Sequence, residues 1–364
     1  MKKRSTTLQL LEMTNEFYDA IQNNCNVDVI YIDFKKAFDS VPINLLLYKL
    51  KLAGITGKLL TFLENFLTNR SFRVKIDDVL SENKPINSGV PQGSVLGPLL
   101  FLIFINDLPN YISENVGIKM YADDVKLYKV HKNDRSTDLT NALIKLEKWG
   151  QLNGLEISPE KCFSLYIGKS NIMEDYYLYE KRIQKCENIR DLGKCLFKNP
   201  SNIKKMKTRE LNTLILAYKS YVRSQLEYAT EIWNPSQNKD IIKIEKVQKF
   251  FTRIAFKKCG LVYKNYKERL KICNLHELST RRTISDMTTT FKIIKGLTCL
   301  NPNKCFILSK RSLRRPLLLR VRSHTTKSQR NFFHRIVKEW NCLPSETIKI
   351  NKHKEFRELL KTLY

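Results

Sequence analysis

Two carboxylates stand side by side in this chain between two short, largely apolar segments. Asp123 and Asp124 lie between segments 118–121 and 125–128, each of which predicts a short strand. A third aspartate, Asp33, comes directly after an earlier apolar segment that also predicts a strand. Carboxylates about 4 Å apart repel by about 4 kcal/mol at an effective dielectric constant of about 20. Bringing these strand ends together therefore requires a compensating cation.

The oxygen atoms of these carboxylates indicate which cation would bind. Oxygen ligands favour Mg²⁺, which keeps several waters and takes one or two carboxylates together with substrate phosphates. Two such ions activate an attacking hydroxyl and stabilise a leaving pyrophosphate, so the acids predict a two-metal phosphoryl-transfer site with Mn²⁺ as an alternative ion. Taken alone, Asp123-Asp124 also fits an ordinary hairpin turn, and Asp33 fits a strand-end cap.

A loop of small residues separates the two acidic positions. It reads Ser-Gly-Val-Pro-Gln-Gly-Ser over residues 88–94 and precedes an apolar run at 95–105, which predicts a buried helix too short to cross a bilayer. Its glycines allow backbone to approach a nucleotide base closely, and Gln92 offers both hydrogen-bond donors and acceptors. Alone, the same residues fit an ordinary Gly-Pro loop before a buried helix.

The distribution of charge divides the chain. Lys and Arg number 64 against 36 Asp and Glu, and the net charge of +28 indicates a polyanionic partner, nucleic acid before a membrane surface. Residues 1–170 hold 21 basic and 19 acidic residues, whereas residues 171–364 hold 43 basic and 17 acidic residues. We therefore expect chemistry in the front part and substrate binding in the back part.

The order of predicted elements indicates an α+β fold with a sheet that is at least partly antiparallel. Strands are expected near 27–33, 71–76, 118–121, 125–128, 155–157 and 162–168. Helices are expected near 6–23, 44–53, 57–68 and 137–152, with Ser94 as the cap of the apolar helix and a hairpin turn at 77–78. Basic helices with apolar stripes are expected at 206–226 and 240–256, a basic, Leu-rich stretch at 308–322 and a last helix at 329–341.

The cysteines and the N-terminus bear on the cellular compartment. The nine cysteines are scattered and form no C-x-x-C pair, which favours buried, reduced thiols over a zinc site or a disulfide framework. The basic residues that follow Met1 are succeeded by polar ones rather than by the apolar core of a signal peptide. We expect an intracellular protein that is neither secreted nor inserted in a membrane.

Three motifs in this order are highly specific. They are Tyr-Ile-Asp-Phe-Lys-Lys-Ala-Phe-Asp-Ser-Val-Pro at 31–42, Gly-Val-Pro-Gln-Gly-Ser-Val-Leu-Gly-Pro at 89–98 and Tyr-Ala-Asp-Asp at 121–124. Together they resemble the reverse transcriptases of non-LTR (LINE-type) retrotransposons, and within these the jockey-like group. Similarity continues through the segments 152–161, 189–193, 221–229, 232–235 and 340–344, so the resemblance covers nearly the whole chain.

The resemblance implies a polymerase palm with a small antiparallel sheet and packed helices, followed by a mostly α-helical, basic thumb and C-terminal region. The implied divisions are a remnant of the fingers at 1–24, the palm at 25–198, a helical thumb at 199–300 and a basic C-terminal helical region at 301–364. We expect the chain to begin after the family's basic fingers region. The segment 192–197 is shorter than the strand pair that the family has there.

The resemblance also implies roles for the acidic residues. Asp33 and Asp123, with Asp124 beside them, would be catalytic and would bind two Mg²⁺ ions. The backbone carbonyl of Phe34 would add a further ligand.

Five more residues match family positions that contact substrate. Phe38 would lie under the sugar and exclude a 2′-hydroxyl, although a core aromatic is the commoner role for such a residue. Gln92 and Gly93 would line the pocket of the incoming nucleotide, and Tyr121 would lie near the primer end. Lys161 resembles the lysine that protonates leaving pyrophosphate, although a solvated surface lysine is more common.

The expected function is that of an RNA-directed DNA polymerase of a mobile element. A primer 3′-hydroxyl would attack the α-phosphorus of a deoxynucleoside triphosphate, with an RNA template and a DNA primer as partners and with the oligomeric state left open. One alternative is a catalytically impaired remnant that only binds RNA or an RNA–DNA hybrid. Another is a metal-dependent nuclease, which uses the same two-ion chemistry, but the five histidines do not cluster with carboxylates.

Overall fold

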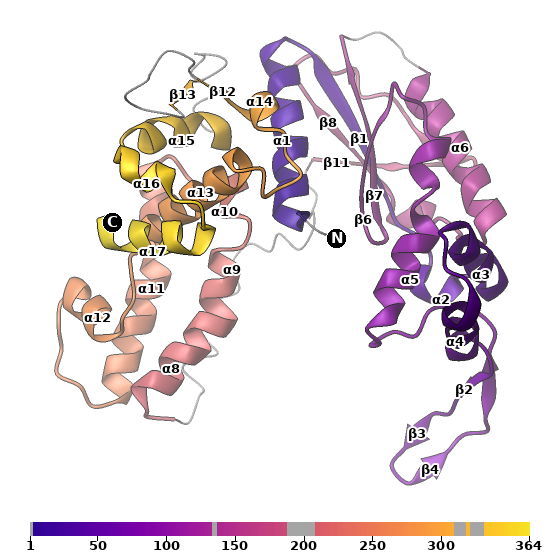
Figure 1. Cartoon of the computed structure of the whole chain (residues 1–364), viewed down its shortest axis with the longest axis horizontal. Coiled ribbons are helices and arrows are strands. Elements are labelled where there is room, and N and C mark those ends of the chain that lie inside the picture. Colours follow the sequence, from indigo (N-terminus) through magenta and orange to yellow (C-terminus); the bar gives the residue numbers. More distant parts are fainter. Residues whose placement is uncertain (1–2, 133–136, 188–207, 309–317, 321–330) are drawn as a thin grey trace. The chain divides into compact units, whose positions relative to one another are not determined.

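The computed structural model describes residues 3–132, 137–187, 208–308, 318–320 and 331–364 (Figure 1). The chain forms two compact units. We call Asp19–Ile189 the sheet unit, and Met1–Tyr18 together with Arg190–Tyr364 the helical unit.

A five-stranded sheet in the order β11-β8-β1-β7-β6 organises the sheet unit (Figure 1). β1 is the central strand and pairs antiparallel with both neighbours, β7 and β8. β6 is antiparallel to β7, and β11 is parallel to β8. All residues of β1 except Tyr31 are buried, as expected for a strand covered on both faces. The strands are β1 Asn26–Ile32, β6 Gly117–Tyr121, β7 Asp124–His131, β8 Phe163–Ile167 and β11 Gln184–Cys186.

The helices of the sheet unit begin and end close to where the sequence predicts. The Ser94 hydroxyl accepts a hydrogen bond from the backbone N–H of Gly97 at 2.9 Å, so its expected capping role is confirmed. Gly154 ends α6 with a φ of +65°, the left-handed conformation that suits glycine. Among the described residues, no helix is both long and apolar enough to span a bilayer. The helices are α2 Ala37–Ser40, α3 Ile43–Leu52, α4 Gly57–Leu67, α5 Leu96–Ile105 and α6 Asp138–Asn153.

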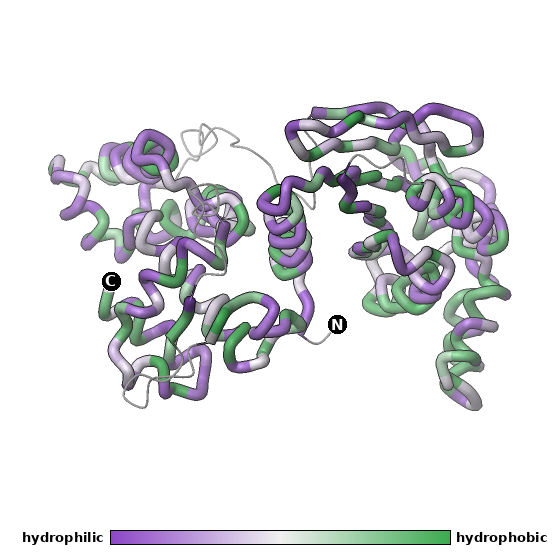
Figure 2. Tube along the Cα trace, turned by 90° about the horizontal axis from the view of Figure 1, so that it is seen from above, coloured by the Kyte–Doolittle hydropathy of each residue, from purple (hydrophilic) through white to green (hydrophobic). Residues whose placement is uncertain are grey.

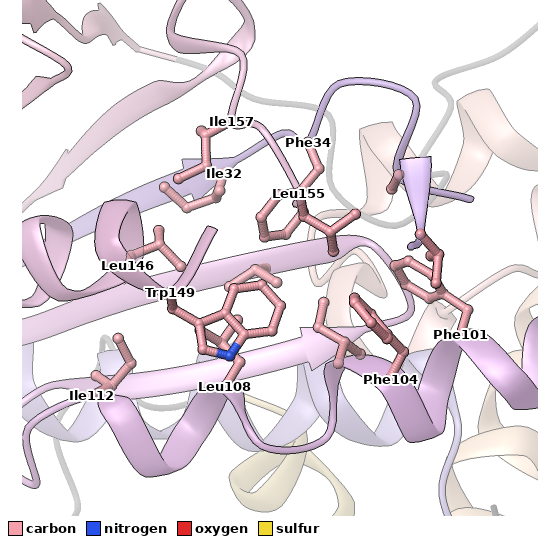
Figure 3. Close-up of a cluster of buried hydrophobic side chains, with 14 of the residues drawn as sticks. Ile32, Phe34, Phe101, Phe104, Leu108, Ile112, Leu146, Trp149, Leu155 and Ile157 are labelled. Atoms are coloured by element: carbon pink, nitrogen blue, oxygen red, sulfur yellow. The ribbon is translucent and has the colours of Figure 1, made fainter. Parts of the chain in front are cut away.

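Trp149 of α6 lies at the centre of the core of the sheet unit (Figure 3). Its side chain is fully buried, and its indole N–H donates to Asp107 Oδ1 at 3.3 Å. The ring of Phe34 packs against it with 6.2 Å between ring centres. Because Phe34 follows Asp33 directly, this packing anchors the segment that carries the first predicted carboxylate.

Short hairpins complete the sheet unit. The strand expected at 71–76 is divided into two, because the chain passes from one strand pair to another within it. The turn expected at 77–78 is confirmed: it joins β3 to β4, and Asp77 has a φ of +52°. The β3–β4 hairpin extends away from the helices of this unit (Figure 1). The short strands are β2 Arg70–Phe72, β3 Lys75–Ile76, β4 Val79–Leu80, β5 Lys84–Ile86, β9 Tyr177–Leu178 and β10 Lys181–Arg182.

Amphipathic helices build the helical unit. Hydrophobic and hydrophilic residues alternate along them, as expected for helices with one buried face (Figure 2). Its largest core surrounds Phe291, Trp340 and Phe356 and includes Leu8 and Leu11 from α1. The helices are α1 Thr6–Gln22 (which begins in this unit), α8 Leu211–Ala217, α9 Ser224–Leu226, α10 Thr230–Trp233, α11 Asn238–Lys258, α12 Tyr266–Ile272, α13 Leu278–Ile294, α14 Pro302–Cys305, α15 Phe332–Asn341, α16 Ser345–Lys349 and α17 His353–Leu363. A strand pair is formed by β12 Ile307–Leu308 and β13 Leu319–Arg320.

Some expectations differ from the structure. The strand expected at 155–157 is reduced to a single bridge between Ile157 and Phe34. A π-helix, Tyr218–Arg223, interrupts the continuous helix expected at 206–226. Most described cysteines are not buried, and Cys299 and Cys342 are exposed. The expected motif at 189–193, the shortened segment at 192–197 and most of the basic stretch at 308–322 lie outside the described residues.

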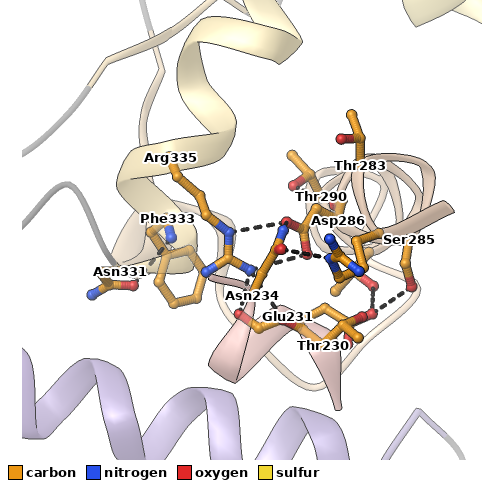
Figure 4. Close-up of polar contacts among 12 residues, drawn as sticks. Thr230, Glu231, Asn234, Thr283, Ser285, Asp286, Thr290, Asn331, Phe333 and Arg335 are labelled. Atoms are coloured by element: carbon orange, nitrogen blue, oxygen red, sulfur yellow. Dashed lines mark hydrogen bonds and ion pairs between the residues drawn. The ribbon is translucent and has the colours of Figure 1, made fainter. Parts of the chain in front are cut away.

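A buried ionic network joins three helices of the helical unit (Figure 4). Arg335 of α15 donates from Nε and Nη2 to the two carboxylate oxygens of Asp286 of α13, at 3.0 and 3.1 Å. Arg335 Nη2 also donates to the carbonyl of Glu231 of α10 at 2.6 Å, and Asn234 donates to Asp286 at 3.1 Å. Burial raises the pKa of Asp286 to about 6, although the charge of Arg335 opposes this shift.

We predict that Arg335→Met lowers the free energy of unfolding by about 3–5 kcal/mol at neutral pH, because it leaves a buried carboxylate without its cation. Urea unfolding measures the change. Lys361→Met is the matched control, since the ion pair of Lys361 with Glu358 is solvent-exposed and should contribute less than about 1 kcal/mol.

The loss in Arg335→Met should depend on pH with a definite sign. Removing the guanidinium raises the pKa of Asp286 further, so the difference in stability from unaltered protein grows as pH rises above about 6. At lower pH the carboxyl is protonated in both proteins, and the remaining loss comes from the backbone hydrogen bonds of Arg335. A loss that is independent of pH between 5 and 8 would contradict this account.

Candidate active site

The pairing of β1 with β7 brings the first acidic position to the second. Ile32, the last residue of β1, is opposite Val125 of β7, so Asp33 emerges beside the turn that joins β6 to β7. In that turn Tyr121 pairs with Asp124, which leaves Ala122 and Asp123 at the tip. Ala122 has a φ of +52°, a conformation that costs a non-glycine residue roughly 1–2 kcal/mol. Such strain is commonly found at functional sites.

The charges around Asp33 show which side chains converge there. Burial raises the pKa of Asp33 above its ordinary value, and the negative charges of Asp123 and Glu160 raise it further. The charge of Lys161 opposes the shift, and its Nζ lies 3.9 Å from Asp33 Oδ1. Asp33 and Lys161 remain accessible, with 48% and 64% of their side chains exposed. The structure therefore brings together Asp33, Asp123 and Lys161 in a site open to solvent.

Asp124 and Tyr121 occupy the base of the same turn. Both are exposed, and Tyr121 keeps 46% of its surface accessible. Asp124 begins β7 next to Asp123, whereas the negative charges that shift the pKa of Asp33 are those of Asp123 and Glu160. The charge of Asp123 therefore acts on Asp33 across the turn.

The backbone of Asp33 is held on both sides. Its N–H donates to Cys162 Sγ at 3.4 Å, and its carbonyl accepts from the N–H of Ser158 at 2.8 Å. Cys162 is fully buried, and this burial raises the pKa of its thiol to about 11, so it acts here as a neutral acceptor. Sequence reasoning did not single out Cys162, because its hydrogen-bond partner lies 129 positions away in the chain.

Within the described part of the chain, the backbone pairing at Phe34 leaves its carbonyl unused. Phe34 and Ile157 form an antiparallel bridge whose flanking hydrogen bonds run from Ser158 to Asp33 and from Lys35 to Glu156, at 2.8 and 2.7 Å. The bridge therefore does not use the carbonyl of Phe34 itself.

The donor set can be tested against the chemistry of magnesium. Among the residues that the structure describes, no group of three or more His, Cys, Asp or Glu side chains is arranged to hold a metal ion. Magnesium does not require such a group, since it keeps several waters and takes one or two carboxylates. The carboxylates of Asp33 and Asp123 and the carbonyl of Phe34 are hard oxygen donors and fit Mg²⁺. The pKa of Asp33 is raised, so as the pH falls this carboxylate takes up a proton earlier than an ordinary aspartate does. Its affinity for a cation should therefore begin to decline at a higher pH.

The loop at 88–94 packs against the segment that follows β1. The backbone N–H of Gly89 donates to Val41 and that of Val90 donates to Phe38, both at 2.8 Å. Gly89 has a φ of +83°, and a Cβ there would lie 2.7 Å from the Asp39 backbone. Gly93 has a similar φ of +81° but open space around it. Gly89 is therefore required both by its positive φ and by its close approach to the Asp39 backbone, whereas Gly93 is required only by its positive φ.

Gln92 and Phe38 are oriented by neighbours within this loop region. Gln92 Nε2 donates to Asp39 Oδ1 at 2.8 Å, and this bond does not use the amide oxygen of Gln92. The ring of Phe38 stacks on Phe101 with 4.4 Å between ring centres and is only partly buried. Asp39 was not predicted as a site residue, although it lies within the first motif.

Arg70 fixes the other side of the same loop and was also missed. Its guanidinium donates to the carbonyls of Gly89 and Ser88 at 2.6 and 3.2 Å, and to Leu67 at 2.7 Å. Burial lowers the pKa of Arg70. A single arginine after a helix carries no recognisable sequence signal, so only the structure assigns it this role.

Comparisons with known proteins identify relatives of this chain. The family model described as "Reverse transcriptase (RNA-dependent DNA polymerase)" matches residues 1–227. The RNA-directed DNA polymerase from mobile element jockey of Drosophila melanogaster is 33% identical over 168 residues, which is 44% of this chain and 18% of that protein. The probable RNA-directed DNA polymerase from transposon X-element of the same organism is 23% identical over 279 residues, which is 68% of this chain and 30% of that protein.

One solved structure in the comparison is telomerase from Candida tropicalis in complex with a fragment of telomeric RNA. It aligns with 98% of this chain and 52% of its own, at 12% identity and a TM-score of 0.43. The chain spans less than a fifth of the length of the jockey polymerases that it matches.

We predict that Gly89→Ala destabilises the sheet unit more than Gly93→Ala does. Both substitutions place Ala at a positive φ, which costs roughly 1–2 kcal/mol, but only the former adds a clash with the Asp39 backbone. Urea unfolding of both variants checks the difference, which should be about 1–3 kcal/mol. Equal losses would show that residues 39 and 89 are not in close contact.

Proposed function

The chain belongs to the reverse transcriptase (RNA-dependent DNA polymerase) family, and on that premise we propose that it extends a DNA primer on an RNA template. The observation that carries the proposal is the pairing of β1 with β7, which places Asp33 beside the turn that holds Asp123, next to an accessible Lys161. The substrates would be deoxynucleoside triphosphates. We assign the sheet unit the role of the palm and the basic helices of the helical unit that of the thumb.

Asp33, Asp123 and the carbonyl of Phe34 would hold the metal ions, with Asp124 as an adjacent carboxylate. Two bound Mg²⁺ ions would activate the primer 3′-hydroxyl and stabilise charge on the leaving pyrophosphate, and Mn²⁺ would be an alternative. Two backbone hydrogen bonds of Asp33 support this assignment: its N–H donates to Cys162, and its carbonyl accepts from Ser158. They fix the backbone from which the carboxylate projects.

The remaining residues would position the substrate and move a proton. Gln92 and Gly93 would form the pocket for the incoming nucleotide, and Tyr121 would lie at the primer end. Phe38 would pack under the sugar. Lys161 keeps its ammonium 3.9 Å from Asp33 Oδ1, and we assign it the delivery of a proton to the leaving pyrophosphate.

The proposal predicts that Asp123→Ala abolishes primer extension while the fold is retained. An oligo(dT) primer on poly(rA) with dTTP and Mg²⁺ provides the assay, because it needs only template-directed addition. Asp78→Ala is a matched control: Asp78 also belongs to an Asp-Asp pair at a hairpin turn, between β3 and β4, and should leave extension unchanged.

Two outcomes would overturn this assignment. Extension by Asp123→Ala at the unaltered rate would remove Asp123 from the chemistry. An unaltered chain that retards the poly(rA) template in a gel but adds no nucleotide would be a protein that only binds nucleic acid.

A second prediction concerns sugar selection. Phe38→Val should reduce the preference for dTTP over UTP by about 10- to 100-fold, because the smaller side chain leaves room for a 2′-hydroxyl. The ratio of kcat/KM values for the two nucleotides is the measurement. Phe62→Val, at a ring of α4 that is 56% exposed, should leave the ratio unchanged. If the dTTP to UTP ratio is unchanged in Phe38→Val, the ring does not select the sugar and serves only in packing.

A further inference from the structure

The loop between α11 and α12 exposes an aromatic ring together with two aliphatic side chains. Tyr263 and Val262 are each 77% exposed, and Leu261 is 42% exposed. Three successive apolar side chains that face solvent make this loop a candidate binding surface. We call residues 260–265 the tyrosine loop.

Both ends of the tyrosine loop are fixed by helix caps. Gly260 ends α11 with a φ of +64°, and the N–H of Leu261 donates to Phe256 at 3.0 Å. At the other end, Asn265 Oδ1 accepts from the N–H of Glu268 at 3.0 Å and caps α12. The caps therefore fix both ends of the loop before any ligand binds, which lowers the entropic cost of binding.

A buried arginine supports the exposed ring from beneath. Arg269 is only 5% exposed, and its guanidinium donates to Thr252 at 3.2 Å and to the carbonyl of Lys264 at 2.6 Å. Its guanidinium carbon lies 5.6 Å from the centre of the Tyr263 ring, a cation–π distance. Arg269 thus orients Tyr263, while most of the ring surface stays in solvent.

The charge around the tyrosine loop identifies the kind of ligand. Residues 253–272 contain seven basic residues and one acidic residue. The exposed cations among them are Arg253, Lys257, Lys264, Lys267 and Lys271. A polyanion with flat apolar groups satisfies both the lysines and the ring, and nucleic acid has this chemistry. A neutral apolar protein surface would satisfy the ring and leave the lysines without anions.

We propose that the tyrosine loop binds single-stranded nucleic acid by stacking an unpaired base on Tyr263, with the neighbouring lysines contacting phosphates. In a duplex the faces of the bases are covered by their neighbours, so the site selects unpaired strands. Stacking tolerates any base and does not read the 2′-hydroxyl, so RNA and DNA strands bind alike. The proposal does not rest on polymerase activity, because no residue of the sheet unit takes part.

Fluorescence-anisotropy titration of the full chain with labelled 12-nucleotide strands tests the proposal, with EDTA present and in the Asp123→Ala background. Tyr263→Ala should weaken binding of single-stranded RNA and DNA about 5- to 100-fold, and Tyr263→Trp should retain it. Tyr48→Ala is the matched control, since Tyr48 lies on α3 and is 57% exposed. Lys257→Gln with Lys264→Gln should reduce the slope of log K against log salt by about 1.4.

Three results would overturn the proposal, and each would indicate a different role for the ring. Unchanged single-strand affinity in Tyr263→Ala removes the ring from nucleic-acid binding. Full affinity in Tyr263→Leu shows that the contact is apolar rather than stacked. If Tyr263→Ala loses as much affinity for a blunt 12-base-pair duplex as for a single strand, the loop binds duplex rather than unpaired bases. Thermal unfolding by circular dichroism accompanies each variant, and the melting temperature should not change because the ring is exposed.

Discussion

The register between β1 and β7 is the constraint on which the candidate site depends. Ile32 opposite Val125 places Asp33 beside the turn that carries Asp123. β1 is buried on both faces, and a slip of one residue would exchange the side chains that the two faces present, so packing on each face holds the register that the carboxylates need. In the observed register, Ile30, Ile32 and Leu127 pack together in one buried core.

The site is built with an electrostatic cost that a cation can offset. Asp33 is partly desolvated and close to the negative charges of Asp123 and Glu160, and each of these raises its pKa. Hydrogen bonds at Cys162 and Ser158 and the packing of Phe34 on Trp149 prevent the backbone from relaxing away. A rigid scaffold that holds like charges together is what a metal-dependent site requires.

Sequence reasoning predicted features that depend on local pattern. The strand before Asp33, a turn at Asp123-Asp124, the cap at Ser94 and the end of α6 at Gly154 all follow from alternation, turn chemistry and glycine. The structure has these features, with the turn itself at 122–123 because Asp124 already begins β7. The roles of the predicted site residues remain proposals, although the structure places all of them in one unit.

What the sequence could not predict depends on contacts between distant residues. Arg70 meets the loop at 88–89 and Cys162 meets Asp33 only after the chain has folded, and neither residue type signals its partner. The π-helix at Tyr218–Arg223 arises within an ordinary amphipathic pattern, because its apolar spacing fits an α-helix equally well. The exposed Tyr263 stands out only when its accessibility and its contact with Arg269 are known.

Binding of Mn²⁺, followed by the electron paramagnetic resonance signal of the free ion, tests most directly whether Asp33 and Asp123 form one metal site. The full chain should bind Mn²⁺ near neutral pH, and Asp33→Asn and Asp123→Asn should each abolish this binding, while Asp78→Asn should leave it intact. Mn²⁺ affinity in Asp33→Asn equal to that of the unaltered chain would contradict the account, because the two carboxylates would then not share an ion.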